Sequence, residues 1–194
     1  MCLASYSLYL LLERNELLEV PSMIKMDEVI LRAPEISDVE LLYQWENDKS
    51  LWHLSNTITP FSRFTLEQYV LSADTDIFSA KQLRLMIDFD EKTVGCIDLF
   101  NFDANNKRAG IGIIIDEKYR QKSIATKALA ALIHYCFTDL DLHQIYCNIC
   151  EDNKESLSLF EKKDFTIVGK KKEWIRKGDK WMDEYLLQLL KKDL

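Results

Sequence analysis

The chain has 194 residues and a formal net charge of −7 at pH 7, and apolar residues make up 47% of it. This length suits one domain of ordinary size, and the composition excludes a disordered or collagen-like chain. The acidic balance excludes a general surface for nucleic acid or anionic membranes, because both need a dominant basic field. A cationic substrate is compatible with this balance.

The first 20 residues are rich in leucine, but no Lys or Arg precedes the apolar run and no small-residue cleavage site ends it. The run from Cys2 to Leu12 is also too short to cross a bilayer. Two interpretations stay open: a short amphipathic helix, or an extension upstream of a start at Met23 or Met26. We expect residues 1–25 to be an N-terminal extension and residues 26–194 to be the domain.

Periodicities of two and of 3.6 residues alternate along the domain. They predict strands over 29–32, 82–89, 93–102, 107–116, 145–150, 165–175 and 181–189. They predict helices over 34–48, around 66–71, over 123–140 and over 153–163. The expected fold is a single α/β domain with a mixed central sheet of about six to seven strands flanked by helices.

The five cysteines, an odd number, do not form a disulfide framework and are typical of a reducing compartment, so we expect a cytoplasmic protein. Cys147 and Cys150 have a spacing that can bind zinc or carry redox chemistry. No second Cys pair or His pair follows them, and a spacing of three on a strand places the two thiols on opposite faces. We therefore expect no metal.

A strand over 110–116 passes through a short loop into the helix that begins at Ser123. The first N–H groups of such a helix are unpaired and lie at its positive dipole end, where a phosphate binds well. Arg120 and Lys122 add positive charge there. A plain helix capped by Ser123 explains the same pattern, and both interpretations stay open.

Residues 119–129 resemble the acetyl-CoA loop of GNAT-fold N-acetyltransferases, in which Arg120 and Ala125 match and Ser123 replaces the usual Gly. Residues 151–165 are similar to the family's Asn-x-x-Ser/Ala-x-x-Leu-Tyr helix. Leu31, Arg32, Asp38 and residues 45–48 resemble the branch that includes ribosomal-protein N-terminal and spermidine or diamine acetyltransferases. The resemblance covers residues 27–189 in the family's order of elements.

The resemblance implies that acetyl-CoA is the cosubstrate. Parted strands around 113–115 and 145–150 would hold its pantetheine arm, and loop amides would hold its pyrophosphate. The implied cofactor-binding residues are Ile113, Ile114, Ile115, Arg120, Gln121, Lys122, Ser123, Ile124, Ala125, Thr126, Asn153 and Ser156. At Ser123, a positive φ would cost a residue other than glycine about 1 kcal/mol.

Three positions are candidates for catalysis. Phe160 stands where many family members carry the Tyr that protonates the leaving thiolate, which Phe cannot do. Asp98 interrupts an apolar face formed by Val94, Cys96, Phe100 and Phe102. It is either a base for the acceptor amine, or an acid that is satisfied by a partner such as Arg108 or lies near the rim of the sheet. Glu46, in the helix expected to face the acceptor, is second, with a solvated helix face as its alternative.

The implied activity is acetyl transfer to a primary amine, with a small polyamine or diamine as the first choice of acceptor. A protein N-terminus is the alternative acceptor. A CoA-binding homologue with little turnover is the alternative of another class, because Ser123 and Phe160 both depart from the family pattern. We expect no nucleic-acid or membrane partner, and a homodimer is left open.

Overall fold

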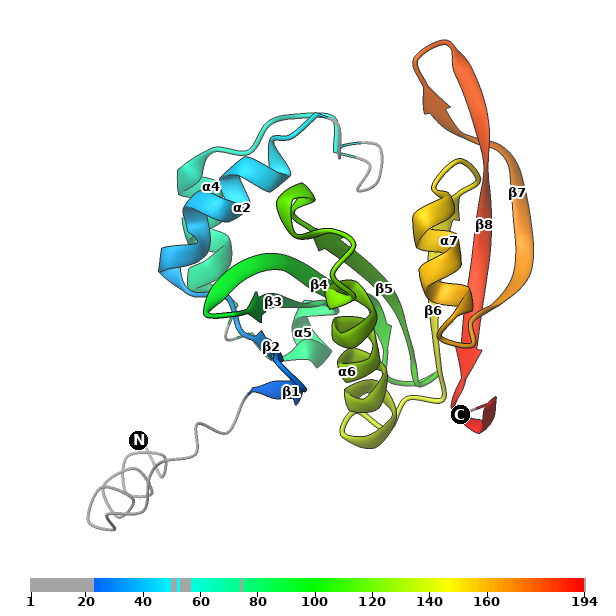
Figure 1. Ribbon diagram of the computed structural model, residues 1–194, viewed down its shortest axis with the longest axis horizontal. Coiled ribbons are helices and arrows are strands. Elements are labelled where there is room, and N and C mark those ends of the chain that lie inside the picture. Colours follow the sequence, from blue (N-terminus) through cyan, green and yellow to red (C-terminus); the bar gives the residue numbers. More distant parts are fainter. Residues whose placement is uncertain (1–22, 50–51, 53–56, 74, 194) are drawn as a thin grey trace.

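The computed structural model describes residues 23–49, 52, 57–73 and 75–193. Most of the N-terminal extension expected over 1–25 therefore lies outside the described residues. Residues 24 and 25 of that extension, with residue 26 of the expected domain, form the first strand, which pairs with the second (Figure 1).

One sheet of eight strands in the order β1-β2-β3-β4-β5-β6-β8-β7 runs through the described chain. Only β5 and β6 are parallel neighbours within it. The seven predicted strands are all present, and β1 is the eighth. The strands are β1 (Ile24–Met26), β2 (Val29–Arg32), β3 (Leu83–Phe89), β4 (Lys92–Asp103), β5 (Arg108–Ile115), β6 (Gln144–Cys150), β7 (Thr166–Lys177) and β8 (Lys180–Leu190).

Helices cover both faces of the sheet (Figure 1). The α-helices are α2 (Val39–Glu46), α4 (Arg63–Leu71), α5 (Ile77–Ala80), α6 (Ile124–Thr138) and α7 (Lys154–Glu161). Short 3-10 turns are η1 (Ile36–Asp38), η2 (Glu117–Tyr119) and η3 (Lys191–Asp193). The larger core packs α6 and α7 on the sheet, and a smaller core packs α2 and α4 against Met86 and Cys96. The predicted helices are confirmed to within a few residues.

Arg32 joins β2 to the helical region that follows it. Two of its nitrogens donate to Asp38 at 2.7 and 2.9 Å, and its Nε donates to Asp88 on β3 at 2.6 Å. Burial is the largest single effect and raises the pKa of Asp38, but the hydrogen bonds from Arg32 and from the Glu35 N–H, together with the attraction of the Arg32 charge, outweigh it and the pKa is lowered. The Arg32 and Asp38 pair of the sequence resemblance is therefore a structural link between the sheet and the α2 region.

The predicted single apolar face of β4 is wrong. Pairing with β3 skips Val94, and pairing with β5 is irregular between Phe100 and Asp103, where Asn101 has a φ of 50°. Each bulge adds a residue to the strand and so shifts the alternation of its side chains. Val94 and Phe102 consequently pack in the larger core, while Cys96 packs in the smaller one.

The strands β5 and β6 pair only at their starts, where residues 108–110 face residues 144–146. Beyond Gly110 and Tyr146 no further pairing links them within the described residues, so their facing edges carry backbone groups outside the sheet ladder. The expected parted strands are confirmed from 111 and 147 onward, whereas 145 and 146 are still paired.

The ring of Phe100 lies where β5 and β6 separate. A Cβ on Gly110 would lie 2.2 Å from the Phe100 ring, so this position needs glycine. The same ring packs edge-on to Tyr146 with centroids 6.0 Å apart. One aromatic side chain thus lies over both residues of the last parallel pair.

Candidate functional site

A cavity of about 540 Å³ lies where β5 and β6 have separated. Its walls come from both halves of the sheet, from the end of α2 and from the start of α7. Glu46, Asp98 and Phe160, the three catalytic candidates, all line it. So do four of the predicted cofactor residues, Ile113, Ile114, Asn153 and Ser156. The fold therefore brings together residues that the sequence separates by more than a hundred positions.

The two candidate carboxylates are bridged by Arg84, a residue that sequence reasoning missed. Arg84 on β3 donates from Nε and Nη2 to the two oxygens of Asp98, both at 2.8 Å, and from Nη1 to Glu46 at 2.5 Å. The three side chains are only 16–26% exposed. Burial by itself lowers the pKa of Arg84, but attraction from Asp98, Cys96 and Glu46 and the hydrogen bonds to Asp98 together outweigh it, and the pKa is raised well above its ordinary value. Arg84 is a permanent cation between two carboxylates.

Asp98 does have a basic partner, as one interpretation of the sequence expected, but that partner is Arg84 and not Arg108. Arg108, the example that the sequence offered, pairs with Asp103 at 3.2 Å. Arg84 lies directly opposite Asp98 in the antiparallel β3–β4 ladder, and cross-strand neighbours are close enough for an ion pair. The predicted strands over 82–89 and 93–102 follow each other closely enough to pair as a hairpin. A basic residue on the first strand, opposite Asp98 in that pairing, was the signal that could have identified Arg84.

On the other half of the sheet, Glu184 and Lys171 also line the cavity and were not predicted. They are cross-strand partners on β8 and β7, and Lys171 Nζ lies 2.7 Å from Glu184 Oε2. Lys171 also donates to Asn148 Oδ1 at 3.0 Å. Glu184 is 8% exposed, which makes it one of two charged residues that are buried among the described residues.

The predicted anion-binding loop runs from η2 into α6. Ser123 has a φ of 59° and Gln121 a φ of 63°, so Ser123 adopts the left-handed conformation that favours glycine. The Ser123 side chain makes no capping hydrogen bond. Arg120 Nε donates to Ile115 O at 3.2 Å, while residues 120–123 are exposed. Ile115 and residues 120–126 do not line the cavity, and their backbone forms the separate entry to α6.

Residues at the start of α7 close one side of the cavity. Asn153 caps the helix by accepting from the Ser156 N–H at 3.1 Å. Phe160 lies one turn beyond Ser156 on α7 and is 3% exposed. Its ring packs edge-on to the ring of Phe165, with the two ring centroids 5.0 Å apart. The phenyl ring of Phe160 therefore combines a packing role with a face on the cavity.

The Cys147 and Cys150 thiols are both buried and unpaired with any other cysteine among the described residues. Burial raises the pKa of each thiol. The part of the chain that the structure describes holds no group of three or more His, Cys, Asp or Glu residues arranged for a metal ion. No described helix has the length and apolar character to span a membrane.

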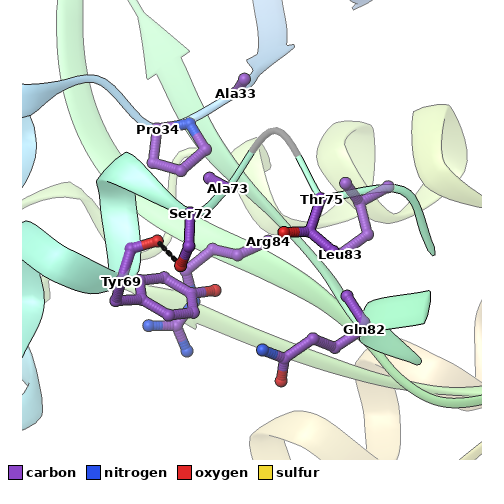
Figure 2. Close-up of a pocket in the computed structure, with 10 residues that line it drawn as sticks. Ala33, Pro34, Tyr69, Ser72, Ala73, Thr75, Gln82, Leu83 and Arg84 are labelled. Atoms are coloured by element: carbon purple, nitrogen blue, oxygen red, sulfur yellow. Dashed lines mark hydrogen bonds between the residues drawn. The ribbon is translucent and has the colours of Figure 1, made fainter.

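A second cavity, of about 240 Å³, lies between the end of α4 and the start of β3. Figure 2 shows Tyr69, Ser72, Ala73 and Leu83 around it, with the Arg84 side chain running behind the Tyr69 ring. The Arg84 guanidinium carbon lies 5.6 Å from the centroid of that ring. Arg84 thus borders both cavities and forms part of the wall between them.

Comparison with known proteins agrees with this geometry. The model of the acetyltransferase (GNAT) domain matches residues 28–166. The spermidine N(1)-acetyltransferase of Escherichia coli K12 is 26% identical over 144 residues, which are 73% of this chain and 74% of that protein.

Two solved structures show the same fold. The spermidine N-acetyltransferase of Vibrio cholerae, in complex with CoA and spermine, aligns with a TM-score of 0.78 at 21% identity over 86% of this chain and 97% of that chain. RimL, a ribosomal alpha-N-protein acetyltransferase in complex with coenzyme A, aligns with a TM-score of 0.75 at 20% identity over 87% of this chain and 98% of that chain. With the family model covering most of the domain, the chain belongs to the GNAT acetyltransferases and is an N-acetyltransferase.

Proposed function

We propose that this N-acetyltransferase transfers an acetyl group from acetyl-CoA to a primary amine of a small polyamine or diamine. The neutral amine attacks the thioester carbonyl directly in a ternary complex. The carbon–nitrogen bond forms, the carbon–sulfur bond breaks, and the proton lost by the amine leaves with the thiolate or the solvent. Backbone N–H groups along the cavity would stabilise the oxyanion.

Acetyl-CoA fits the residues that border the parted strands. The facing edges of β5 and β6 beyond residues 110 and 146 offer backbone donors and acceptors, which suit the amides of a pantetheine arm. The entry to α6, where residues 121–123 are exposed, offers the first N–H groups of the helix and its positive dipole end, which suit a pyrophosphate. When bound there, the cosubstrate supplies the activated acetyl thioester.

The charge of the cavity is the observation that carries the choice of acceptor. Three carboxylates line it, on Glu46, Asp98 and Glu184, against two cations, on Arg84 and Lys171. One net negative charge remains in a recess of low exposure, where charges interact more strongly than in water. This balance favours a cationic amine over an anionic or neutral acceptor.

An acceptor screen tests the proposal. Purified protein with acetyl-CoA is offered spermidine, spermine, short diamines, free amino acids and peptides with free N-termini, and released CoA thiol is measured. We expect the polyamines and diamines to give the highest kcat/KM. Turnover with peptides alone would instead support the protein N-terminal acetyltransferase, the alternative that the likeness to RimL favours.

A binding experiment locates the cosubstrate. Acetyl-CoA should raise the Tm, because a ligand that binds only the folded state stabilises it. Ala125→Glu, which adds a bulky acid in the first turn of α6, should abolish this rise without unfolding the protein. An undiminished rise would place acetyl-CoA elsewhere. Binding of acetyl-CoA with no turnover of any acceptor would favour a CoA-binding homologue instead of an active enzyme.

We also keep a cytoplasmic location and a homodimer as proposals. The four described cysteines are free thiols, which supports a reducing compartment. The oligomeric state is measured by sedimentation.

A further inference from the structure

Glu184 combines deep burial with a position on the wall of the cavity. It lies near the middle of β8, between β6 and β7, and its cross-strand neighbours are Cys150 and Lys171. A buried carboxylate is costly unless hydrogen bonds satisfy it. The contacts of Glu184 therefore show how the protein offsets this cost.

Only one of the two Glu184 oxygens is occupied. Oε2 accepts from Lys171 Nζ at 2.7 Å. Oε1 has no hydrogen-bond donor within the described residues, yet it is not sealed from solvent, because no fully buried side-chain oxygen or nitrogen there lacks a partner. Glu184 lines the cavity and keeps one carboxylate oxygen that no described residue occupies, so this oxygen is available to a ligand.

The carboxylates on the opposite wall are differently engaged. Both oxygens of Asp98 and one of Glu46 accept from Arg84, whose charge lies between them. Lys171 shares its charge between Glu184 and Asn148, and its side chain is 36% exposed, twice the 18% of Arg84. The cation that holds Glu184 is therefore more exposed, and its charge more screened by solvent, than the cation that holds Asp98 and Glu46.

We propose that Glu184 Oε1 binds an ammonium group of the acceptor, distinct from the neutral amine that attacks the thioester, and that Lys171 sets the strength of this binding. This inference rests on the proposed function, because it takes a cationic amine as the acceptor. The bound ammonium would donate to Oε1 in a charge-assisted hydrogen bond, the strong kind. Lys171 holds the carboxylate through Oε2 and repels the same ammonium, so it orients Glu184 and limits affinity at once.

The two partners therefore have opposite effects on acceptor affinity. Glu184→Gln keeps the size of the side chain but removes its charge, and should weaken the binding of spermidine by about 10- to 100-fold. Lys171→Met keeps the length of the side chain but removes its repulsion, and should tighten spermidine binding by about 3-fold or more. A pair that only stabilises the hairpin would weaken binding in both variants or in neither.

The experiment measures the Kd of spermidine by calorimetry with CoA-saturated protein at pH 8, and separately the KM and kcat for acetyl transfer. Lys170 and Asp183 provide matched controls, because they form a 2.7 Å ion pair one position before each partner and do not line the cavity. Lys170→Met and Asp183→Asn should leave the spermidine Kd unchanged. The Kd of acetyl-CoA should stay within about 2-fold of wild type in every variant.

Opposite shifts in Glu184→Gln and Lys171→Met would support the inference, and equal shifts or none would overturn it. If Glu184→Gln fails to fold, Glu184→Asp retains the charge on a shorter side chain and should weaken spermidine binding by a smaller factor. Because the calorimetric Kd needs no turnover, wild-type protein that binds spermidine through Glu184 but does not acetylate it would refute the proposed activity alone. Wild-type protein that binds no spermidine would refute the role of Glu184.

Discussion

Arg84 donates to both carboxylate oxygens of Asp98, its direct cross-strand neighbour, at 2.8 Å each. A third donor of the same guanidinium reaches Glu46 at the end of α2. The two acids that the sequence offered as independent candidates are therefore one ionic unit. This unit also ties α2 to the β3–β4 ladder beside the cavity.

Loss of Arg84 should destabilise the fold. Arg84→Met leaves two carboxylates of low exposure without their cation, and we expect the free energy of unfolding to fall by about 2–4 kcal/mol. Urea denaturation measures the change. Arg63→Met is the matched control, since it removes an ion pair with Glu40 whose side chains are 55% and 57% exposed, and should shift the midpoint much less. Equal shifts would show that Arg84 is not a structural centre.

Asp98→Asn should affect the acceptor and not the cosubstrate. It removes a negative charge from the cavity and the proton acceptor that the sequence suggested, so kcat/KM should fall by roughly 100-fold or more. Acetyl-CoA affinity should be nearly unchanged. Asp88→Asn, which disturbs the Arg32 ion pair on the same sheet outside the cavity, should leave kcat/KM close to wild type. A parallel loss of acetyl-CoA binding would make Asp98 structural.

The backbone at Ser123 is strained, and a glycine should relieve the strain. Ser123 has a φ of 59°, so it pays the steric penalty of the left-handed conformation. Ser123→Gly removes this penalty, which exceeds the extra conformational entropy that glycine gives the unfolded chain, and should raise the free energy of unfolding by about 0.5–1 kcal/mol. Ser123→Ala keeps the strain and removes a hydroxyl that makes no capping bond, so it should be nearly neutral. A stabilising Ser123→Ala would disprove this assignment of the cause.

Phe160→Tyr should supply an acid near the leaving thiolate if its hydroxyl enters the cavity that the ring lines. We expect a gain of about 2- to 10-fold in the single-turnover rate, with acetyl-CoA affinity little altered. Phe165→Tyr adds the same atom to the neighbouring ring, which does not line the cavity, and should give no gain. A lower rate in folded Phe160→Tyr would mean that another group already protonates the sulfur.

The buried thiols should make stability fall at alkaline pH. Burial raises the pKa of Cys96 and of Cys136 from 9.0 to about 12. As the pH rises, these thiols ionise in the unfolded protein before they ionise in the folded protein, which favours unfolding. Their contribution to the free energy of unfolding is therefore complete below pH 9 and is lost as the pH rises toward 12. The urea midpoint of the wild-type protein should therefore decrease between pH 8 and pH 10. The midpoint of the Cys136→Ala variant should decrease less steeply over the same range. The same burial predicts that the thiols at 96 and 136 react with DTNB only after unfolding.

The local patterns of the sequence determined the elements. Apolar residues at helical spacing marked α2 and α6, and alternating strands marked the β3–β5 meander, because these periods depend on neighbours within one element. The order of the elements and the entry to α6 were readable for the same reason. Motifs over 119–129 and 151–165 placed the family.

The tertiary structure alone decided which charges meet. Arg84 and Asp98 lie 14 residues apart and become partners through the register of β3 and β4, and Glu46 reaches them from a separate helix. Glu184 reaches the same cavity from β8, whose bulged pairing with β7 cannot be derived from alternation. A single bulge exchanges the two faces of a strand, so side-chain environments on β4 and β7 follow from pairing across the sheet and not from position along the chain.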